Sequence, residues 1–140
     1  MFEGKSALKD NYQGKGEHVL LVDHDPSIIE AGKRLMEELG YRVMTCANSA
    51  KALSLIHSTA EEKIDCVICD VSMPDIGGVA IANTCRLCRP GTRFLLSSGS
   101  PDVLSQDSLR ILGIAGVVMK PFSFHFLAKT LHRTLVNYNS

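Results

Sequence analysis

The sequence predicts an α/β protein whose five-stranded parallel sheet is doubly wound, with helices on both faces. Five short apolar segments alternate with five segments of helical spacing. The connections are short and the apolar segments lack strict polar alternation, which favours right-handed crossovers and strands buried on both faces. The chain has 140 residues, of which 45% are hydrophobic and 21% charged, as expected for one globular domain.

The predicted strands are the apolar segments at 18–22, 41–45, 64–69, 93–97 and 114–119. The helices between them have recognisable starts. Asp25-Pro26 supplies an N-cap followed by proline at the first helical position, and Gly40 ends that helix. Asn48 caps the second helix, the third follows a Pro/Gly-rich loop at 73–78, and Ser100-Pro101 begins the fourth. The apolar faces include Ala52, Ile56 and Ala60 in the second helix, Leu104, Ser108 and Ile111 in the fourth, and Phe124, Leu127, Leu131 and Leu135 in the last.

Composition and charge exclude several classes of protein. Residues 1–17 are polar and are predicted to form a flexible N-terminal tail or linker before a domain at 18–140. Lys plus Arg number 15 and Asp plus Glu number 15, so the zero net charge argues against nucleic-acid binding. No apolar run approaches the ~20 residues that a bilayer requires, and no leader is visible. Five cysteines in a chain of this size indicate a reduced, cytoplasmic protein.

Polar side chains follow four of the five predicted strands. The carboxyl ends of parallel strands meet at one edge of a sheet, and ligands bind there. Clustered carboxylates repel one another unless a cation joins them, and oxygen ligands suit Mg²⁺. The residues are Asp23, His24 and Asp25 after the first strand, Asp70 after the third, Ser97 and Ser98 at the fourth, and Lys120 after the fifth.

This set of residues predicts a phosphoryl-transfer site. A carboxylate beside a divalent cation can attack phosphorus and form an acyl phosphate. A lysine ammonium and a serine hydroxyl can hold the phosphoryl oxygens. The acceptor in this interpretation is Asp70.

The chain from about residue 18 to 136 resembles the response-regulator receiver domain of two-component signalling. The resemblance implies the flavodoxin-like strand order 2-1-3-4-5. It depends on four short motifs that occur in the expected order at the predicted strand ends. The motifs are Val22-Asp23-His24-Asp25-Pro26, Cys69-Asp70-Val71-Ser72-Met73-Pro74 with Gly78 four positions further on, Ser98-Gly99, and Met119-Lys120-Pro121-Phe122.

The resemblance implies roles for these residues. Asp70 would be the phosphoacceptor and would hold Mg²⁺ together with Asp23 and the backbone carbonyl of Ser72. Ser98 and Lys120 would contact the phosphoryl group, with Ser98 as the conformational switch. Ser97 is the alternative switch hydroxyl, although the family spacing favours its neighbour.

The resemblance also implies partners and a cis peptide bond. The phosphoryl donor would be a sensor histidine kinase or a histidine phosphotransfer protein. The final strand and helix carry basic but no acidic residues, which favours a solvated face; the alternative is a surface for an acidic partner or for a homodimer through the fourth helix, fifth strand and fifth helix, where receivers often associate. The bond between Lys120 and Pro121 is expected to be cis. The chain is interpreted either as a stand-alone regulator or as the receiver of a hybrid sensor kinase.

Two positions depart from the family pattern. The second position of the usual acidic pair is His24, with Asp25 next in line as a substitute ligand. Imidazole is a poor ligand for Mg²⁺ and a good one for transition metals, so Mn²⁺ or another divalent metal is an alternative cofactor. Val117 occupies a position where many receivers carry a Tyr or Phe that moves with the switch hydroxyl.

Three other interpretations compete with a phosphoacceptor. A degenerate pseudo-receiver would act only as a docking module. A haloacid-dehalogenase-type phosphohydrolase would use Asp23 as its nucleophile, but that family needs acids after the lysine, and the last acid here is Asp107. A flavin-binding flavodoxin relative is disfavoured because Asp23-His24-Asp25 would repel a phosphate.

The cysteine spacing resembles a zinc site, but the predicted elements argue against one. Cys66 and Cys69 are three residues apart on a strand and therefore face opposite sides. Cys85 and Cys88 fall on an apolar helical stripe with Ile81. We therefore predict buried thiols rather than zinc ligands.

Overall fold

The computed structural model describes residues 11–58 and 62–136. Five parallel strands form one sheet in the order β2-β1-β3-β4-β5, which confirms the predicted fold. The strands are β1 (His18–Val22), β2 (Arg42–Cys46), β3 (Cys66–Asp70), β4 (Arg93–Ser98) and β5 (Gly116–Met119). The helices are α2 (Pro26–Glu38), α3 (Ser49–His57), α4 (Gly78–Cys88), α5 (Gln106–Leu112) and α6 (Phe124–Val136).

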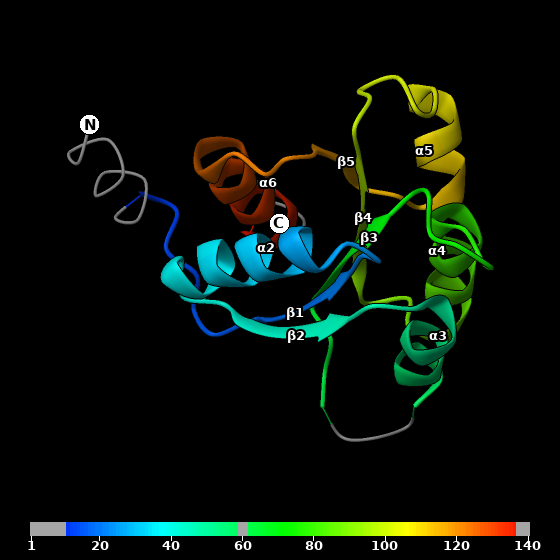
Figure 1. Cartoon of the computed structure of the whole chain (residues 1–140), viewed down its shortest axis with the longest axis horizontal. Helices are drawn as coiled ribbons and strands as arrows, with labels where there is room; N and C mark the ends of the chain where they lie inside the picture. The colour runs from blue at the N-terminus through cyan, green and yellow to red at the C-terminus, as the bar shows by residue number, and fades with distance from the viewer. Residues whose placement is uncertain (1–10, 59–61, 137–140) are drawn as a thin grey trace.

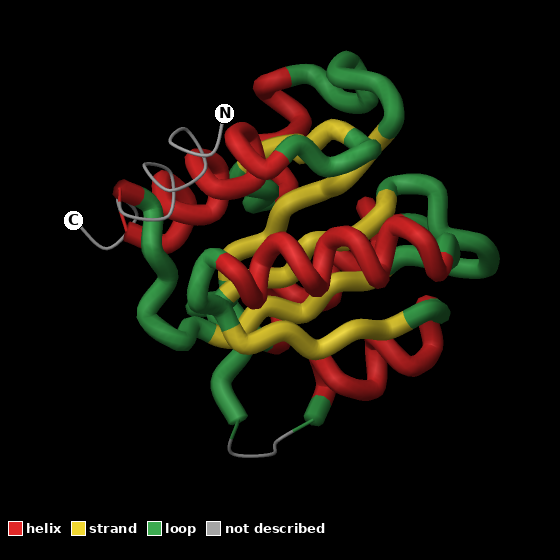
Figure 2. The backbone as a smooth tube through the Cα atoms, turned by 60° about the vertical axis from the view of Figure 1, so that its left-hand side comes forward, coloured by secondary structure: helices red, strands yellow, loops and turns green. Residues whose placement is uncertain are grey.

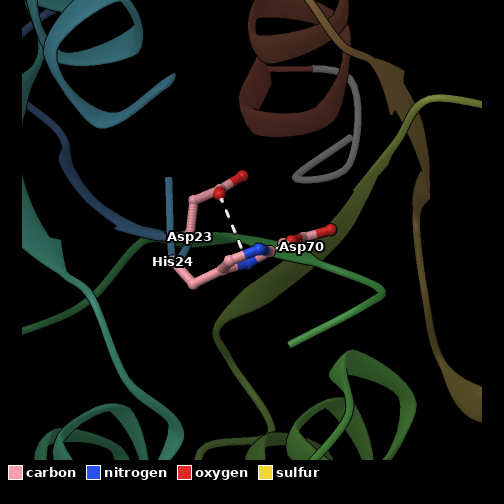
Figure 3. Close-up of side chains that lie close together, drawn as sticks. All are labelled: Asp23, His24 and Asp70. Carbon is pink, nitrogen blue, oxygen red and sulfur yellow. Dashed lines mark ion pairs between the residues drawn. The ribbon is translucent and has the colours of Figure 1, made fainter. Parts of the chain in front are cut away.

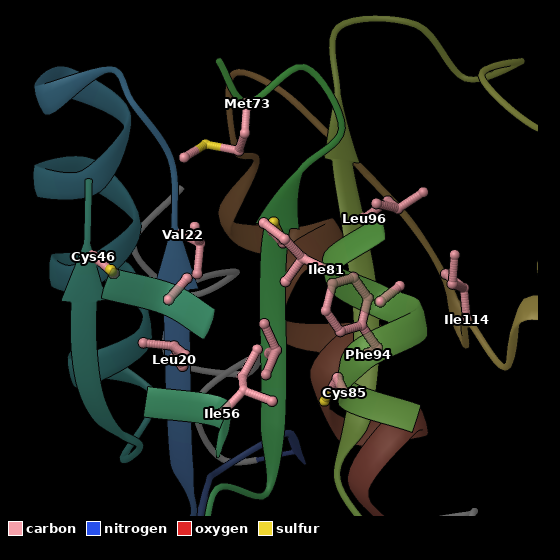
Figure 4. Packing of buried hydrophobic residues seen from close by; sticks show 14 of the residues in the cluster. Leu20, Val22, Cys46, Ile56, Met73, Ile81, Cys85, Phe94, Leu96 and Ile114 are labelled. Carbon is pink, nitrogen blue, oxygen red and sulfur yellow. The ribbon is translucent and has the colours of Figure 1, made fainter. Parts of the chain in front are cut away.

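The helices cover both faces of the sheet, as Figures 1 and 2 show. Helices α2 and α6 pack on one face, where Met36 and Leu131 are fully buried. Helices α3, α4 and α5 pack on the other, where Ile56, Ile81 and Leu109 contribute to the core shown in Figure 4. Two-sided coverage explains why the strand segments are continuously apolar.

Strand β3 lies at the centre of the sheet and is buried along its whole length. Its residues alternate between the two cores: Cys66 and Ile68 face the α2–α6 side, whereas Val67 and Cys69 face the α3–α5 side. This alternation follows from the two-residue repeat of a strand. Cys66 and Cys69 therefore cannot share one metal ion, as the sequence predicted.

Helix α2 lies directly against the segment that follows Lys120. A Cβ atom added to Gly32 would lie 2.7 Å from Leu21 Cδ2 and 2.8 Å from Phe122 Cε2. Such separations are too short for a side chain, so this close approach requires glycine. The contact fixes α2 relative to β1 and to the segment after β5.

The fourth helix starts later than the sequence predicts. Ser105, rather than Ser100, is the N-cap of α5, and its Oγ accepts a hydrogen bond from the Ser108 N–H at 3.1 Å. The backbone N–H of Ser100 instead donates to Ser98 Oγ at 3.0 Å, which ties Ser100 to the strand end. The later start buries Leu109 and leaves Ile111 75% exposed, so its predicted place on the apolar face is wrong.

One cysteine prediction is also wrong. Cys88 is exposed, because it is the last residue of α4 and lies beyond the core, with its Sγ 3.4 Å from His57 Nδ1. The other four cysteines are buried. Burial raises the pKa of the Cys85 thiol to about 11 and also raises the pKa values of Cys66 and Cys69.

The described part of the N-terminal segment contacts the domain. The N–H groups of Gly14 and Gly16 donate to the carbonyls of Leu39 and Gly40. The Tyr12 ring meets the His132 ring edge-on, with centroids 5.3 Å apart.

The predicted boundary between 1–17 and 18–140 stays a prediction, and Ala60, predicted on the face of α3, lies outside the described residues. No helix in the described ranges has the length and apolar character that crossing a bilayer demands.

Candidate functional site at the carboxyl edge of the sheet

Two buried aspartates occupy adjacent strand ends. Asp23 directly follows β1 and Asp70 is the last residue of β3, and these strands are neighbours in the sheet. Asp23 is 0% exposed and Asp70 is 1% exposed. Such carboxylates require partners, because burial of an unpaired charge is costly.

Lys120 supplies a positive charge to both aspartates. Its Nζ lies 3.1 Å from Asp23 Oδ2 and 3.2 Å from Asp70 Oδ1. Partial burial of the ammonium favours a lower pKa, but hydrogen bonds and charges from Asp23 and Asp70 outweigh it and raise the pKa of Lys120. The backbone N–H of Lys120 donates to the Ser98 carbonyl at 2.8 Å, and the Lys120–Pro121 peptide bond is cis.

His24, and not Asp25, joins this cluster. Its Nδ1 lies 3.1 Å from Asp70 Oδ2 and 3.9 Å from Asp23 Oδ1, as Figure 3 shows. Asp25 instead caps α2, and its Oδ1 accepts hydrogen bonds from the Ser27 N–H and hydroxyl at 2.9 and 2.8 Å. These hydrogen bonds, chiefly that of the Ser27 hydroxyl, lower the pKa of the Asp25 carboxyl.

The two oxygens of Asp70 have different surroundings. Oδ1 accepts a hydrogen bond from the Ser72 N–H at 3.1 Å and contacts Lys120. Oδ2 is buried and accepts no hydrogen bond within the described residues; its polar contact is with Nδ1 of His24. An acceptor left in this state has lone pairs available for a ligand.

These side chains fit a divalent cation. One ligand atom each from Asp23, His24 and Asp70 can be chosen so that all lie within 4.8 Å of one another. Two carboxylates and an imidazole suit a dication that accepts both oxygen and nitrogen ligands. The backbone of Ser72 lies in the turn after β3, where its N–H is already directed at Asp70.

Ser97 and Ser98 are both buried at the end of β4. Ser97 pairs with Asp70 across the sheet, and its Oγ has no hydrogen-bond partner within the described residues. Ser98 Oγ accepts the hydrogen bond from Ser100. Val117 in β5 pairs with Leu96 of β4, and its half-buried side chain packs against the α3–α5 core.

Sequence reasoning missed one residue that supports this edge. Ser49 is 2% exposed, and its hydroxyl lies 3.1 Å from the Pro74 carbonyl and 2.7 Å from the Ile76 carbonyl. It thereby joins α3 to the loop after Asp70. A serine at the first position of a helix gives no signal of such a long-range contact.

Comparisons with known proteins agree with this geometry. The family model of the response regulator receiver domain matches residues 19–132. The chain is 30% identical over 117 residues to the sensor kinase CckA of Brucella abortus, covering 84% of this chain and 12% of that protein. It is 29% identical to the transcriptional regulatory protein GlrR of Escherichia coli, covering 76% of this chain and 23% of that protein. The chain therefore spans less than a quarter of either relative.

Solved structures show the same fold. The chemotaxis protein CheY4 of Vibrio cholerae superposes with a TM-score of 0.76 at 28% identity, covering 86% of this chain and 99% of that one. The receiver domain of sensor histidine kinase PA1611 of Pseudomonas aeruginosa, described with a magnesium ion in its active site cleft, gives a TM-score of 0.71 at 22% identity. It covers 86% of this chain and 98% of that one. Motifs, strand order and family match agree, and the chain belongs to the response regulator receiver domains of two-component systems.

Proposed function

We propose that Asp70 accepts a phosphoryl group from the phosphohistidine of a sensor histidine kinase or histidine phosphotransfer protein. The observation that carries this proposal is the state of the Asp70 carboxylate. One oxygen is held by Lys120 and the Ser72 N–H, whereas the buried Oδ2 contacts His24 Nδ1 and accepts no hydrogen bond from the described residues. A carboxylate fixed in this way is oriented for attack.

The proposed step exchanges one bond to phosphorus for another. A bond forms between phosphorus and an Asp70 oxygen as the bond to the donor imidazole nitrogen breaks, and that nitrogen keeps the electron pair. Lys120 offsets the charge on the phosphoryl oxygens. Ser98 is proposed to follow the phosphoryl group as the switch. A divalent cation held by Asp23 and Asp70, with the Ser72 carbonyl as a further ligand, would neutralise the remaining charge when bound.

The test is intact-mass spectrometry after incubation with acetyl phosphate and a divalent cation, in parallel with Mg²⁺ and Mn²⁺. One labile phosphoryl adduct is expected on the native chain and none on Asp70→Asn. The matched control is Asp65→Asn, at the opposite end of β3, which should keep the adduct. An adduct that persists in Asp70→Asn contradicts the proposal.

The same experiment separates the alternatives. A phosphohydrolase of the haloacid-dehalogenase type would carry the group on Asp23, which peptide mapping distinguishes from Asp70. In the structure Asp23 Oδ1 accepts a hydrogen bond from the Asp25 N–H at 2.9 Å and Oδ2 contacts Lys120, whereas Asp70 Oδ2 accepts no hydrogen bond from the described residues. A pseudo-receiver would give no adduct with either metal.

A homodimer through α5, β5 and α6 is also proposed. Each of these elements exposes a large apolar residue: Ile111 at 75%, Met119 at 42% and Phe126 at 67%. Burial of such residues between two copies is favourable. Light scattering on native protein and Phe126→Ser, with and without acetyl phosphate, tests this association. Cytoplasmic location stays a prediction from cysteine content.

A further inference from the structure

We propose that His24 makes the carboxyl-edge site a mixed nitrogen–oxygen site, which binds a transition-metal dication through its imidazole in preference to Mg²⁺. The inference rests on the proposed function, because it concerns the cation that would accompany phosphorylation of Asp70.

The position of the ring is the first argument. His24 Nδ1 is 3.1 Å from Asp70 Oδ2 and 3.9 Å from Asp23 Oδ1. Ligands about 2.1 Å from an octahedral ion lie about 3 Å from their neighbours. The ring nitrogen therefore already stands at ligand spacing from one carboxylate, and a shift of under about 1 Å brings it to that spacing from the other.

The state of the Asp70 carboxylate supports the same assignment. Asp70 Oδ2 is buried and lacks a hydrogen-bond donor in the described part of the chain. It faces the same space as the His24 nitrogen (Figure 3). Its polar contact among the described residues is the His24 nitrogen at 3.1 Å, so this oxygen keeps lone pairs that a cation can take. A dication between it and His24 would satisfy both atoms.

No neighbouring acid takes the place of the His24 imidazole in this cluster. Asp25 is the nearest candidate in sequence, but its carboxylate accepts two hydrogen bonds from Ser27 at the start of α2. Release of that carboxylate would leave the first turn of α2 without its side-chain cap, which destabilises the helix. The third side chain of the described cluster is therefore His24.

Charge favours the same conclusion. The two carboxylates and the Lys120 ammonium sum to one net negative charge. An acid in place of His24 would leave two. Mg²⁺ prefers oxygen ligands and gives up water reluctantly, so it depends on that charge. First-row transition metals gain affinity from imidazole nitrogen and lose less from the missing charge.

The experiment measures metal binding directly, without phosphorylation. Calorimetry with Mg²⁺, Mn²⁺ and Co²⁺ gives affinities, and pulsed electron paramagnetic resonance of bound Mn²⁺ detects a directly coordinated nitrogen. The native chain should bind Co²⁺ at least about tenfold more tightly than Mg²⁺ and show nitrogen coupling. His24→Asp should lose the coupling, bind Mg²⁺ more tightly and narrow the Co²⁺ preference by about tenfold or more.

The matched control is His125→Asp. It makes the same substitution at an exposed position in α6. It should keep both the nitrogen coupling and the Co²⁺ preference. His24 is 47% exposed in its side chain, so its replacement by aspartate is expected to leave the fold intact, and circular dichroism checks this.

Each contrary outcome overturns the inference. Nitrogen coupling that survives in His24→Asp would assign the metal to another histidine. Equal affinity of the native chain for Mg²⁺ and Co²⁺, or no binding of either, removes the proposed preference. An Asp70 adduct formed with Mg²⁺ alongside such a result would leave the proposed function standing. Conversely, nitrogen coupling without an adduct under any metal would refute the phosphoacceptor role alone.

Discussion

Strand β3 has an aspartate at each end, and the fold surrounds the two carboxylates differently. Asp65 precedes β3 at the amino edge of the sheet. Its Oδ2 accepts the His18 N–H at 2.8 Å, and its Oδ1 lies 3.5 Å from Nζ of the exposed Lys63. Asp70 ends β3 at the carboxyl edge, where its buried Oδ2 accepts no hydrogen bond from the part of the chain that the structure describes.

The two carboxylates differ in how their oxygens are held. Asp65 joins the starts of two neighbouring strands, and both of its oxygens have partners in the described structure. Asp70 is more deeply buried, and its Oδ2 accepts no hydrogen bond from the described residues, its polar contact there being His24 Nδ1 at 3.1 Å. A buried polar atom left in this state lowers stability, and such costs concentrate at sites that bind a ligand.

The largest expected effect comes from filling space at the carboxyl edge. A Cβ atom added to Gly78 would lie 2.6 Å from the Asp70 carbonyl oxygen and 2.9 Å from Val71 Cα, and backbone cannot yield easily. Gly78→Ala should lower the free energy of unfolding by about 2–3 kcal/mol. Gly91→Ala at the amino edge meets nothing within 4 Å and should change it by less than about 0.5 kcal/mol. Urea denaturation measures both, and equal losses would contradict the prediction.

The next effect compares the two aspartates themselves. Asp65→Asn should lower the free energy of unfolding by about 1 kcal/mol, because a charge-assisted hydrogen bond becomes a neutral one. Asp70→Asn should leave it unchanged or raise it by up to about 1 kcal/mol, because it removes one of two adjacent buried carboxylates. Thermal and urea unfolding at neutral pH decide between these signs. If Asp70→Asn lowered the free energy of unfolding more than Asp65→Asn does, Asp70 would contribute more to stability than Asp65, which contradicts the prediction.

A smaller effect appears at alkaline pH. The pKa of Lys120 is raised above its ordinary value of 10.5 by its contacts with Asp23 and Asp70. Its contribution to stability is therefore complete below pH 10.5 and is lost as pH rises through the higher folded-state pKa. The free energy of unfolding, measured as a function of pH, should fall in this alkaline range for the native chain and should fall less for Lys120→Met. The control is Lys63→Met at the amino edge, whose free energy of unfolding should fall with alkaline pH as steeply as that of the native chain.

The smallest effect concerns thiol reactivity and leaves stability unchanged. Cys88 lies at the end of α4, near the amino edge, and is exposed, whereas Cys66 and Cys69 within β3 are buried with raised pKa values. One thiol should react quickly with an alkylating reagent in the native chain at neutral pH. Cys88→Ser should abolish this fast phase, as mass spectrometry would show. Fast labelling of a second thiol would indicate that the central strand opens.

The sequence predicted the architecture well because the strands are buried on both faces. Continuous apolar runs and capped helices determine strand number and order of elements. The start of α5 could not be predicted, because Ser100 and Ser105 are both good N-caps. What distinguishes them is the hydrogen bond from the Ser100 N–H to Ser98 Oγ, two residues earlier in the chain, whereas Ser105 Oγ accepts the Ser108 N–H.

The site was predicted in outline for the same topological reason. Residues at the ends of parallel strands meet at one edge, so Asp23, Asp70 and Lys120 were expected together. The sequence left the choice between His24 and Asp25 as a ligand open, although it already indicated Asp25 as the N-cap of α2, which is the role that the structure shows. The support from Ser49 was equally hidden, because no local pattern encodes a hydroxyl that contacts a distant loop.

The contact between Phe122 and the bare backbone at Gly32 sets a condition for protein design. Transplanting the loops that carry Asp23, Asp70 and Lys120 onto another scaffold would not reproduce their spacing. The ring that anchors the lysine-bearing segment rests on a helix ninety positions earlier in the chain. A grafted version must import that helix, with its glycine, as part of the same unit.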